Sequence, residues 1–144
     1  MKLFYYLEKN YKILYFFAML AVALWVAYIK GWIFANFDSI SAKEALALIE
    51  QKRYPIVDIR PKEQYEKGHI KGSLSLPFST FPKSIGKLAP YKKSKIILYS
   101  KSGREGIDAS RILIKEGFHP INVKSGILGL ALVGANTKPE LFTK

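Results

Sequence analysis

The feature that most constrains this chain is an uninterrupted apolar run near its amino terminus. Residues 13–29, ILYFFAMLAVALWVAYI, contain no charged side chain. A helix rises about 1.5 Å per residue, so this run covers roughly 25 Å, close to the thickness of a bilayer's hydrocarbon core. Four tyrosines between residues 5 and 15 lie around its start, and Trp25, Tyr28 and Trp32 lie around its end, as in the aromatic belts of membrane spans. We therefore expect a transmembrane helix over residues 13–35, after an amino-terminal tail of residues 1–12.

Two other interpretations of the run are disfavoured. A buried helix of a globular domain would rarely be so long and so uniformly apolar. A signal peptide would need cleavage after the triplet Ile33–Ala35, which is a weak site. We therefore favour an anchor that is retained in the mature chain.

The lysines that flank the run bear on its orientation. Three of them precede it and two follow it: Lys2, Lys9 and Lys12, then Lys30 and Lys43. Positive residues concentrate on the cytoplasmic side of a span. This count favours an amino terminus inside the cell and places the rest of the chain outside the cytoplasm, in the periplasm if the source is a bacterium.

Predicted strands and helices alternate through the rest of the chain, residues 38–144, which we take as one domain. Apolar runs predict strands over residues 55–59, 73–76, 95–99 and 120–123. Amphipathic or capped stretches predict helices over residues 41–51, 61–67, 104–116 and 126–133, with one more between residues 77 and 94. This alternation favours an α/β fold with a mainly parallel sheet.

A loop of small and charged residues follows the clearest strand, residues 95–99. It consists of Ser100, Lys101, Ser102, Gly103, Arg104 and Glu105. In open parallel sheets ligands bind beyond the carboxyl ends of the strands. Backbone N–H groups in such a loop, together with the positive end of the next helix, favour a bound anion. We expect an oxyanion-binding loop, with a solvated turn as the alternative.

The composition adds an exclusion, because the chain contains no cysteine. Disulfides, thiolate metal sites and thiol nucleophiles are therefore excluded. The chain has two histidines, His69 and His119, so we expect no metal site and no cofactor. The formal net charge of +12 favours anionic partners such as lipid headgroups, nucleic acid or acidic protein surfaces.

One stretch of the chain resembles the opening of a rhodanese domain. Asp58 and Arg60 close a predicted strand, as in the D-x-R motif of that family, and residues 63–73, EQYEKGHIKGS, are similar to its E-[FY]-x-x-G-H-I-x-G-[AS] motif. The resemblance implies that Asp58, Arg60, Gly68 and His69 have structural roles. Later similarities are the strand before the loop, the pair Gly117–Phe118, and Ser125–Ile127 in place of Gly-Gly-Ile.

The resemblance covers residues 39–130 and implies a fold as well as an activity. The fold is rhodanese-like, a five-stranded and mainly parallel sheet with helices on both faces. In active members the loop begins with a cysteine, whose thiolate holds a sulfane sulfur as a persulfide. Here that position is Ser100, and a hydroxyl cannot hold a persulfide. The arginine that usually closes the loop falls on Glu105, and the usual tryptophan falls on Leu130.

These departures predict a member of the family that has lost catalysis. Family membership alone suggests a thiosulfate sulfurtransferase, but the missing cysteine disfavours it. Serine hydrolysis is disfavoured as well, because neither histidine is expected within reach of Ser100. We expect a single-pass membrane protein with a binding or regulatory domain.

The expected partners are the membrane and, at the loop, an acidic protein surface or a small oxyanion. A lipid-facing patch is an alternative for the lysines between residues 83 and 95, and an ordinary solvated surface is favoured over it. These lysines are Lys83, Lys87, Lys92, Lys93 and Lys95. Nucleic acid is not expected, because the charge has no recognition motif beside it.

Overall fold

The computed structural model describes residues 2–29, 36–135 and 137–143, and the chain forms two compact units, Met1–Ala35 and Asn36–Lys144. The first unit contains the helix α1 (Lys2–Ile29), which includes most of the expected tail. Its segment Glu8–Ile29 is long and apolar enough to cross a membrane, and none of that segment is buried. The expected carboxyl end of the span, with Lys30, Trp32 and the triplet Ile33–Ala35, lies outside the described residues.

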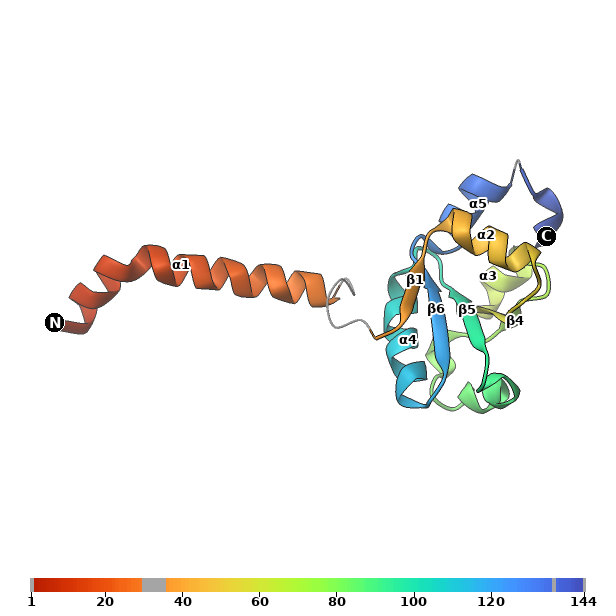
Figure 1. The fold of residues 1–144 in the computed structure, drawn as a ribbon, viewed down its shortest axis with the longest axis horizontal. Coiled ribbons are helices and arrows are strands. Elements are labelled where there is room, and N and C mark those ends of the chain that lie inside the picture. Colours follow the sequence, from red (N-terminus) through yellow and green to blue (C-terminus); the bar gives the residue numbers. More distant parts are fainter. Residues whose placement is uncertain (1, 30–35, 136, 144) are drawn as a thin grey trace. The chain divides into compact units, whose positions relative to one another are not determined.

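A five-stranded parallel sheet forms the centre of the second unit (Figure 1). Its strands are β1 (Asp38–Ile40), β2 (Ile56–Asp58), β4 (Leu74–Ser75), β5 (Lys95–Tyr99) and β6 (His119–Val123). They lie in the order β1-β6-β5-β2-β4, and every neighbouring pair is parallel. The rhodanese-like fold class predicted from the sequence is confirmed.

Four helices lie close to their predicted positions: α2 (Ala42–Glu50), α3 (Lys62–Lys67), α4 (Arg104–Lys115) and α5 (Gly126–Gly134). At the start of α2, the Ser41 hydroxyl accepts a hydrogen bond from the Glu44 N–H at 3.3 Å. The Glu44 carboxylate in turn accepts one from the Ser41 N–H at 2.8 Å, which completes a capping box. This local signal explains why α2 begins where the sequence predicts.

The segment between β4 and β5 differs from the prediction of one helix. It contains two short 3₁₀ helices, η1 (Phe78–Thr80) and η2 (Ile85–Tyr91). Pro90 lies inside η2, and a proline cannot donate the backbone hydrogen bond that an α-helix requires.

Alternate side chains of β5 face the two cores of the unit. Ile97 and Tyr99 pack in a buried cluster with side chains of α2 and α5, whereas Ile96 and Leu98 pack with side chains of α4 and η2. This alternation is the period of a β-strand whose two faces are both covered. Helices therefore cover both faces of the sheet, as expected.

A second, smaller sheet was not predicted from the sequence. β3 (His69–Ile70) pairs with β7 (Phe142–Thr143) in antiparallel register, after the 3₁₀ helix η3 (Pro139–Leu141). This pairing attaches the described end of the chain to the turn that follows α3.

Candidate functional site

The candidate loop begins directly after β5, at the carboxyl edge of the sheet. Ser100 is only 1% exposed, and its Oγ accepts a hydrogen bond from the Gly103 N–H at 2.9 Å. The carbonyl oxygen of Ser100 accepts the Ile127 N–H at 2.8 Å, and that of Lys101 accepts the Leu128 N–H at 3.2 Å. The loop is therefore fixed to the first turn of α5, and Ser100 forms its buried floor.

Gly103 allows the loop to turn into α4. Its φ of 89° is left-handed, and a Cβ at this position would lie 1.9 Å from the carbonyl oxygen of Lys124. No side chain caps α4 at Gly103. Because the first N–H groups of a helix have no partner inside it, the start of α4 presents donors toward the loop. Such donors, together with the positive end of the helix dipole, favour an anion.

The polar and charged side chains of the loop after Ser100 are exposed: Lys101, Ser102, Arg104 and Glu105. The two cations increase the attraction for an anion, and the carboxylate of Glu105 in the first turn of α4 reduces it. The arrangement can hold an anionic oxygen group by hydrogen bonds and charge.

Asn122 of β6, which was not among the predicted site residues, supports the loop. Its side chain is 1% exposed, and its amide donates to the carbonyl oxygen of Gly103 at 3.3 Å. Gly106 leaves room for it, because a Cβ there would lie 2.0 Å from Asn122 Oδ1. An asparagine between two apolar residues of a strand predicted as buried is the signal that could have marked Asn122 as a buried polar side chain, but it does not identify the partner.

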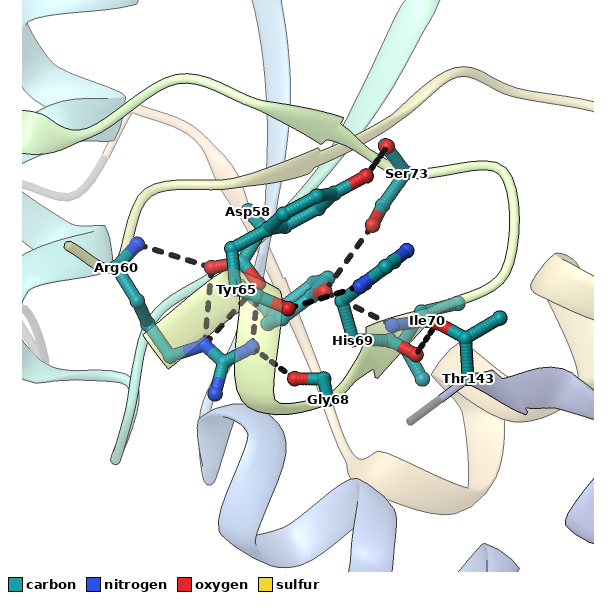
Figure 2. Close-up of polar contacts among 9 residues, drawn as sticks. Asp58, Arg60, Tyr65, Gly68, His69, Ile70, Ser73 and Thr143 are labelled. Atoms are coloured by element: carbon teal, nitrogen blue, oxygen red, sulfur yellow. Dashed lines mark hydrogen bonds and ion pairs between the residues drawn. The ribbon is translucent and has the colours of Figure 1, made fainter. Parts of the chain in front are cut away.

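The predicted motif residues Asp58 and Arg60 form a buried ion pair at the same edge of the sheet (Figure 2). Arg60 Nη2 donates to Asp58 Oδ2 at 2.6 Å and to the carbonyl oxygen of Gly68 at 2.7 Å, and Arg60 Nε donates to Asp58 Oδ1 at 3.0 Å. Burial acts to lower the pKa of Arg60, but the hydrogen bond and charge of Asp58 outweigh it and raise this pKa. The guanidinium therefore stays charged and links the end of β2 to Gly68.

The rings of Tyr65 and His69 are stacked with their centroids 3.8 Å apart, and His69 Nδ1 lies 2.9 Å from the carbonyl oxygen of Tyr65 (Figure 2). The Tyr65 hydroxyl donates to the carbonyl oxygen of Ser73 at 2.7 Å. These contacts engage Nδ1 of His69 and the hydroxyl of Tyr65 within the turn. The contacts of His69 are with Tyr65 and Thr143.

Tyr99 connects this turn to the loop, because it directly precedes Ser100. Its hydroxyl accepts the Ile70 N–H at 3.1 Å and lies 3.2 Å from Ser73 Oγ. Burial, and next the charge of Asp58, raise the pKa of Tyr99 well above its ordinary value. Tyr99 therefore remains a neutral phenol that holds the two segments together.

Thus the structure separates the predicted residues into two groups at one edge of the sheet. Asp58, Arg60, Gly68 and His69 bond to one another or to adjacent backbone, whereas the loop presents exposed charges and helix N–H groups. Asp58 and Tyr99 are register partners, so the ends of β2 and β5 place the Asp58–Arg60 pair beside the start of the loop. His119 begins β6, at the opposite edge from Ser100.

Comparison with known proteins gives a family match over most of the second unit. The model of the rhodanese-like domain matches residues 41–131. The uncharacterized protein YibN of Escherichia coli (strain K12) is 30% identical over 116 residues, which cover 74% of this chain and 81% of that protein. The thiosulfate sulfurtransferase PspE of the same strain is 26% identical over 76 residues, which cover 53% of this chain and 73% of that protein.

A solved structure supports the same fold. The crystal structure of a rhodanese-like domain protein from Staphylococcus aureus superposes with a TM-score of 0.60 at 24% identity. The match covers 65% of this chain and 91% of that one.

Proposed function

This chain belongs to the rhodanese-like domain family, and from that premise we propose that it is a membrane-anchored member that binds an anionic group and does not transfer sulfur. The observation on which this rests is the state of Ser100, the residue at the family's cysteine position. The buried hydroxyl of Ser100 accepts a hydrogen bond from the Gly103 N–H, and no cysteine elsewhere in the chain could supply a thiolate. Sulfur transfer requires a thiolate that can hold the sulfur atom, so the scaffold lacks its nucleophile.

The hydroxyl of Ser100 does not serve as a hydrolytic nucleophile in this proposal. A serine nucleophile needs a base within hydrogen-bond distance. His69 is engaged with Tyr65, and His119 lies at the other edge of the sheet. Ser100 instead fixes the conformation of the loop.

The proposed ligand is an anionic oxygen group held by the N–H donors at the start of α4 and by Lys101 and Arg104. Two sources share this chemistry: a small oxyanion and a carboxylate of an acidic protein segment. The loop's exposure favours a ligand that approaches from solvent. The anchor is α1, whose apolar segment is long enough to span a bilayer.

Sulfur transfer is the second candidate function of this chain, because the relatives include the thiosulfate sulfurtransferase PspE. Its activity would come to this chain only with a thiolate, so we rank it below anion binding.

Nuclear magnetic resonance of the full chain in detergent micelles tests the binding proposal. Titration with sulfate or thiosulfate should shift the backbone amides of Ser102 to Gly106, and the double variant Lys101→Gln/Arg104→Gln should lose those shifts. The matched control Lys83→Gln/Lys87→Gln removes the same charge from exposed lysines elsewhere and should retain them. A peptide of glutamates, titrated separately, distinguishes an acidic protein segment from a free oxyanion. Shifts from neither probe at millimolar concentration would refute the anion site.

A further inference from the structure

We propose that the amino edge of the sheet is a docking surface for the anionic headgroups of a lipid bilayer, an inference that rests on the membrane anchor of the proposed function. The surface consists of six exposed cations, which we call the amino-edge patch: Lys52, Arg53, Lys92, Lys93, Lys95 and Lys115. The loop Ser100–Glu105 lies at the opposite edge of the same sheet.

The topology brings these cations to one edge. In a parallel sheet all strands begin at the same edge, and here Asp38 begins β1, Lys95 begins β5 and His119 begins β6. Lys95 and His119 are register partners. Lys52 and Arg53 precede β2, and Lys92 and Lys93 precede β5, whereas Lys115 ends α4 just before β6. The chain therefore enters the sheet, at Asp38, within the edge that carries the patch.

Contacts place three of the six cations, Lys95, Arg53 and Lys92, at this edge. Lys95 Nζ lies 2.7 Å from Asp38 Oδ2, and both side chains are about half exposed. The hydrogen bond and charge of Asp38 raise the pKa of Lys95, and the nearby Arg53 opposes that rise. On the other side, Lys92 Nζ lies 5.5 Å from the centre of the Phe118 ring, next to His119.

The patch carries an excess of positive charge. Three carboxylates lie near this edge: Asp38, Glu50 and Glu116. Asp38 is paired with Lys95, and Glu50 at the end of α2 is paired with Lys138. The remaining cations of the patch outnumber the remaining carboxylate, Glu116, and long lysine and arginine side chains reach readily to a headgroup surface.

Chain length keeps this patch near the bilayer in a chain anchored by α1. Residues 30–37 separate Ile29 from Asp38, and eight residues span at most about 30 Å when fully extended. A tether this short gives the patch a high effective concentration at the headgroups. Anionic lipids attract each cation close to their surface, and the attraction falls off within a Debye length. A bilayer is therefore the anionic partner that the patch meets most often.

The consequence concerns the loop. With the amino edge on the lipid, the carboxyl edge faces the aqueous phase, so the proposed anion site is presented to soluble ligands rather than to the anchor's own bilayer.

Lysine footprinting of the full chain in nanodiscs tests this surface. One set of discs contains phosphatidylcholine alone, and the other contains phosphatidylglycerol as well. Acylation of each lysine is quantified by mass spectrometry in both sets. We expect Lys52, Lys92, Lys93 and Lys115 to react about threefold or more slowly in the anionic discs, with recovery at high salt. Lys101 and Lys124, at the carboxyl edge, should react equally in both.

Charge-reversal variants give the matched control. Lys92→Glu/Lys93→Glu should remove the protection of Lys52 and Lys115, whereas Lys101→Glu/Lys124→Glu, with the same change in net charge, should leave it unchanged. Equal labelling in both lipids, or protection at Lys101 and Lys124 instead, would overturn the docking surface while the anchor stands. Failure of the chain to enter discs at all would refute the anchor, and the docking surface with it.

Discussion

The hydroxyl of Ser100 occupies the position at which sulfur transfer would need a thiolate, and the neighbouring backbone holds it in place. The Oγ accepts one hydrogen bond, from Gly103, and the backbone on either side is fixed to α5. In contrast to this exposed loop, Asp58 and Arg60 form a buried ion pair, and Arg60 also donates to Gly68. The position of Ser100 was predictable, because it follows a strongly apolar strand. The support from Asn122 was not, because its contact with Gly103 joins segments that are distant in sequence.

Replacement of Gly103 by alanine should destabilise the protein. The new Cβ would require a left-handed backbone and would overlap the carbonyl of Lys124, so we expect a loss of at least about 2 kcal/mol in the free energy of unfolding. Gly86→Ala is the control, because a Cβ there meets no atom within 4 Å, and it should change stability by less than about 0.5 kcal/mol. Urea denaturation measures both. Equal effects of the two substitutions would show that the loop is not held as described.

Asp58→Asn should also be costly, because it leaves the buried Arg60 guanidinium without its counter-charge. Breaking one partner of a buried ion pair typically costs about 3–5 kcal/mol. Glu66→Gln breaks the exposed pair with Lys62, whose side chains are 61% and 74% exposed, and should cost no more than about 0.5 kcal/mol. The same denaturation experiment compares them. A loss for Asp58→Asn as small as that for Glu66→Gln would contradict a structural role of the pair.

Elements with strong local signals were predicted well, and those that depend on distant partners were not. The strand Lys95–Tyr99 was predicted to the residue because four successive apolar side chains, residues 96–99, favour a buried strand. β1, with the sequence DSI, has little strand propensity and forms through its pairing with β6. β3 and β7 are each two residues long, and each is stabilised by pairing with the other. Such pairings between distant segments cannot be predicted from the local sequence of either strand.

The capping box of α2 predicts a dependence of stability on pH. Hydrogen bonds from the Ser41 backbone and then its side chain lower the pKa of Glu44 below its ordinary value of 4.5. The stabilisation is therefore present above pH 4.5 and is lost as the pH falls through the lower folded value. Wild type should lose part of its stability in that acid range, and Glu44→Gln should lack that part of the loss. Denaturation curves at neutral and acid pH measure the difference. Parallel pH profiles for the two proteins would refute the contribution.

The two units of the chain differ in what their sequences specify. The second unit has its own cores on both faces of the sheet, and its fold and family followed from motifs spread along most of its length. The described part of the first unit is the helix α1, and its apolar segment Glu8–Ile29 is not buried. Its length and composition were visible in the sequence, whereas the ligand of the loop depends on chemistry outside the chain.

Membrane fractionation tests the anchor. The full chain should sediment with membranes and resist extraction at high pH. Ala21→Arg/Leu24→Arg places two charges in the middle of the apolar segment, each unfavourable there by about 2.5–3.5 kcal/mol, and should release the chain to the soluble fraction. Tyr5→Arg/Tyr6→Arg is the control. These residues lie near the amino-terminal end of α1, before the apolar segment, so the variant should stay in the membrane. A mature chain that begins after Ala35 would instead identify the segment as a cleaved signal peptide.

The most direct test of the proposed function is the transfer of sulfur from thiosulfate to cyanide by the purified full chain. The parent should produce no thiocyanate above the protein-free background, because Ser100 cannot form a persulfide. Ser100→Cys/Glu105→Arg, which restores the family's residues at both positions, should produce measurable thiocyanate, and Ser100→Cys alone should produce less. Turnover by the cysteine-free parent, at a rate comparable with that of the double variant, would contradict the account.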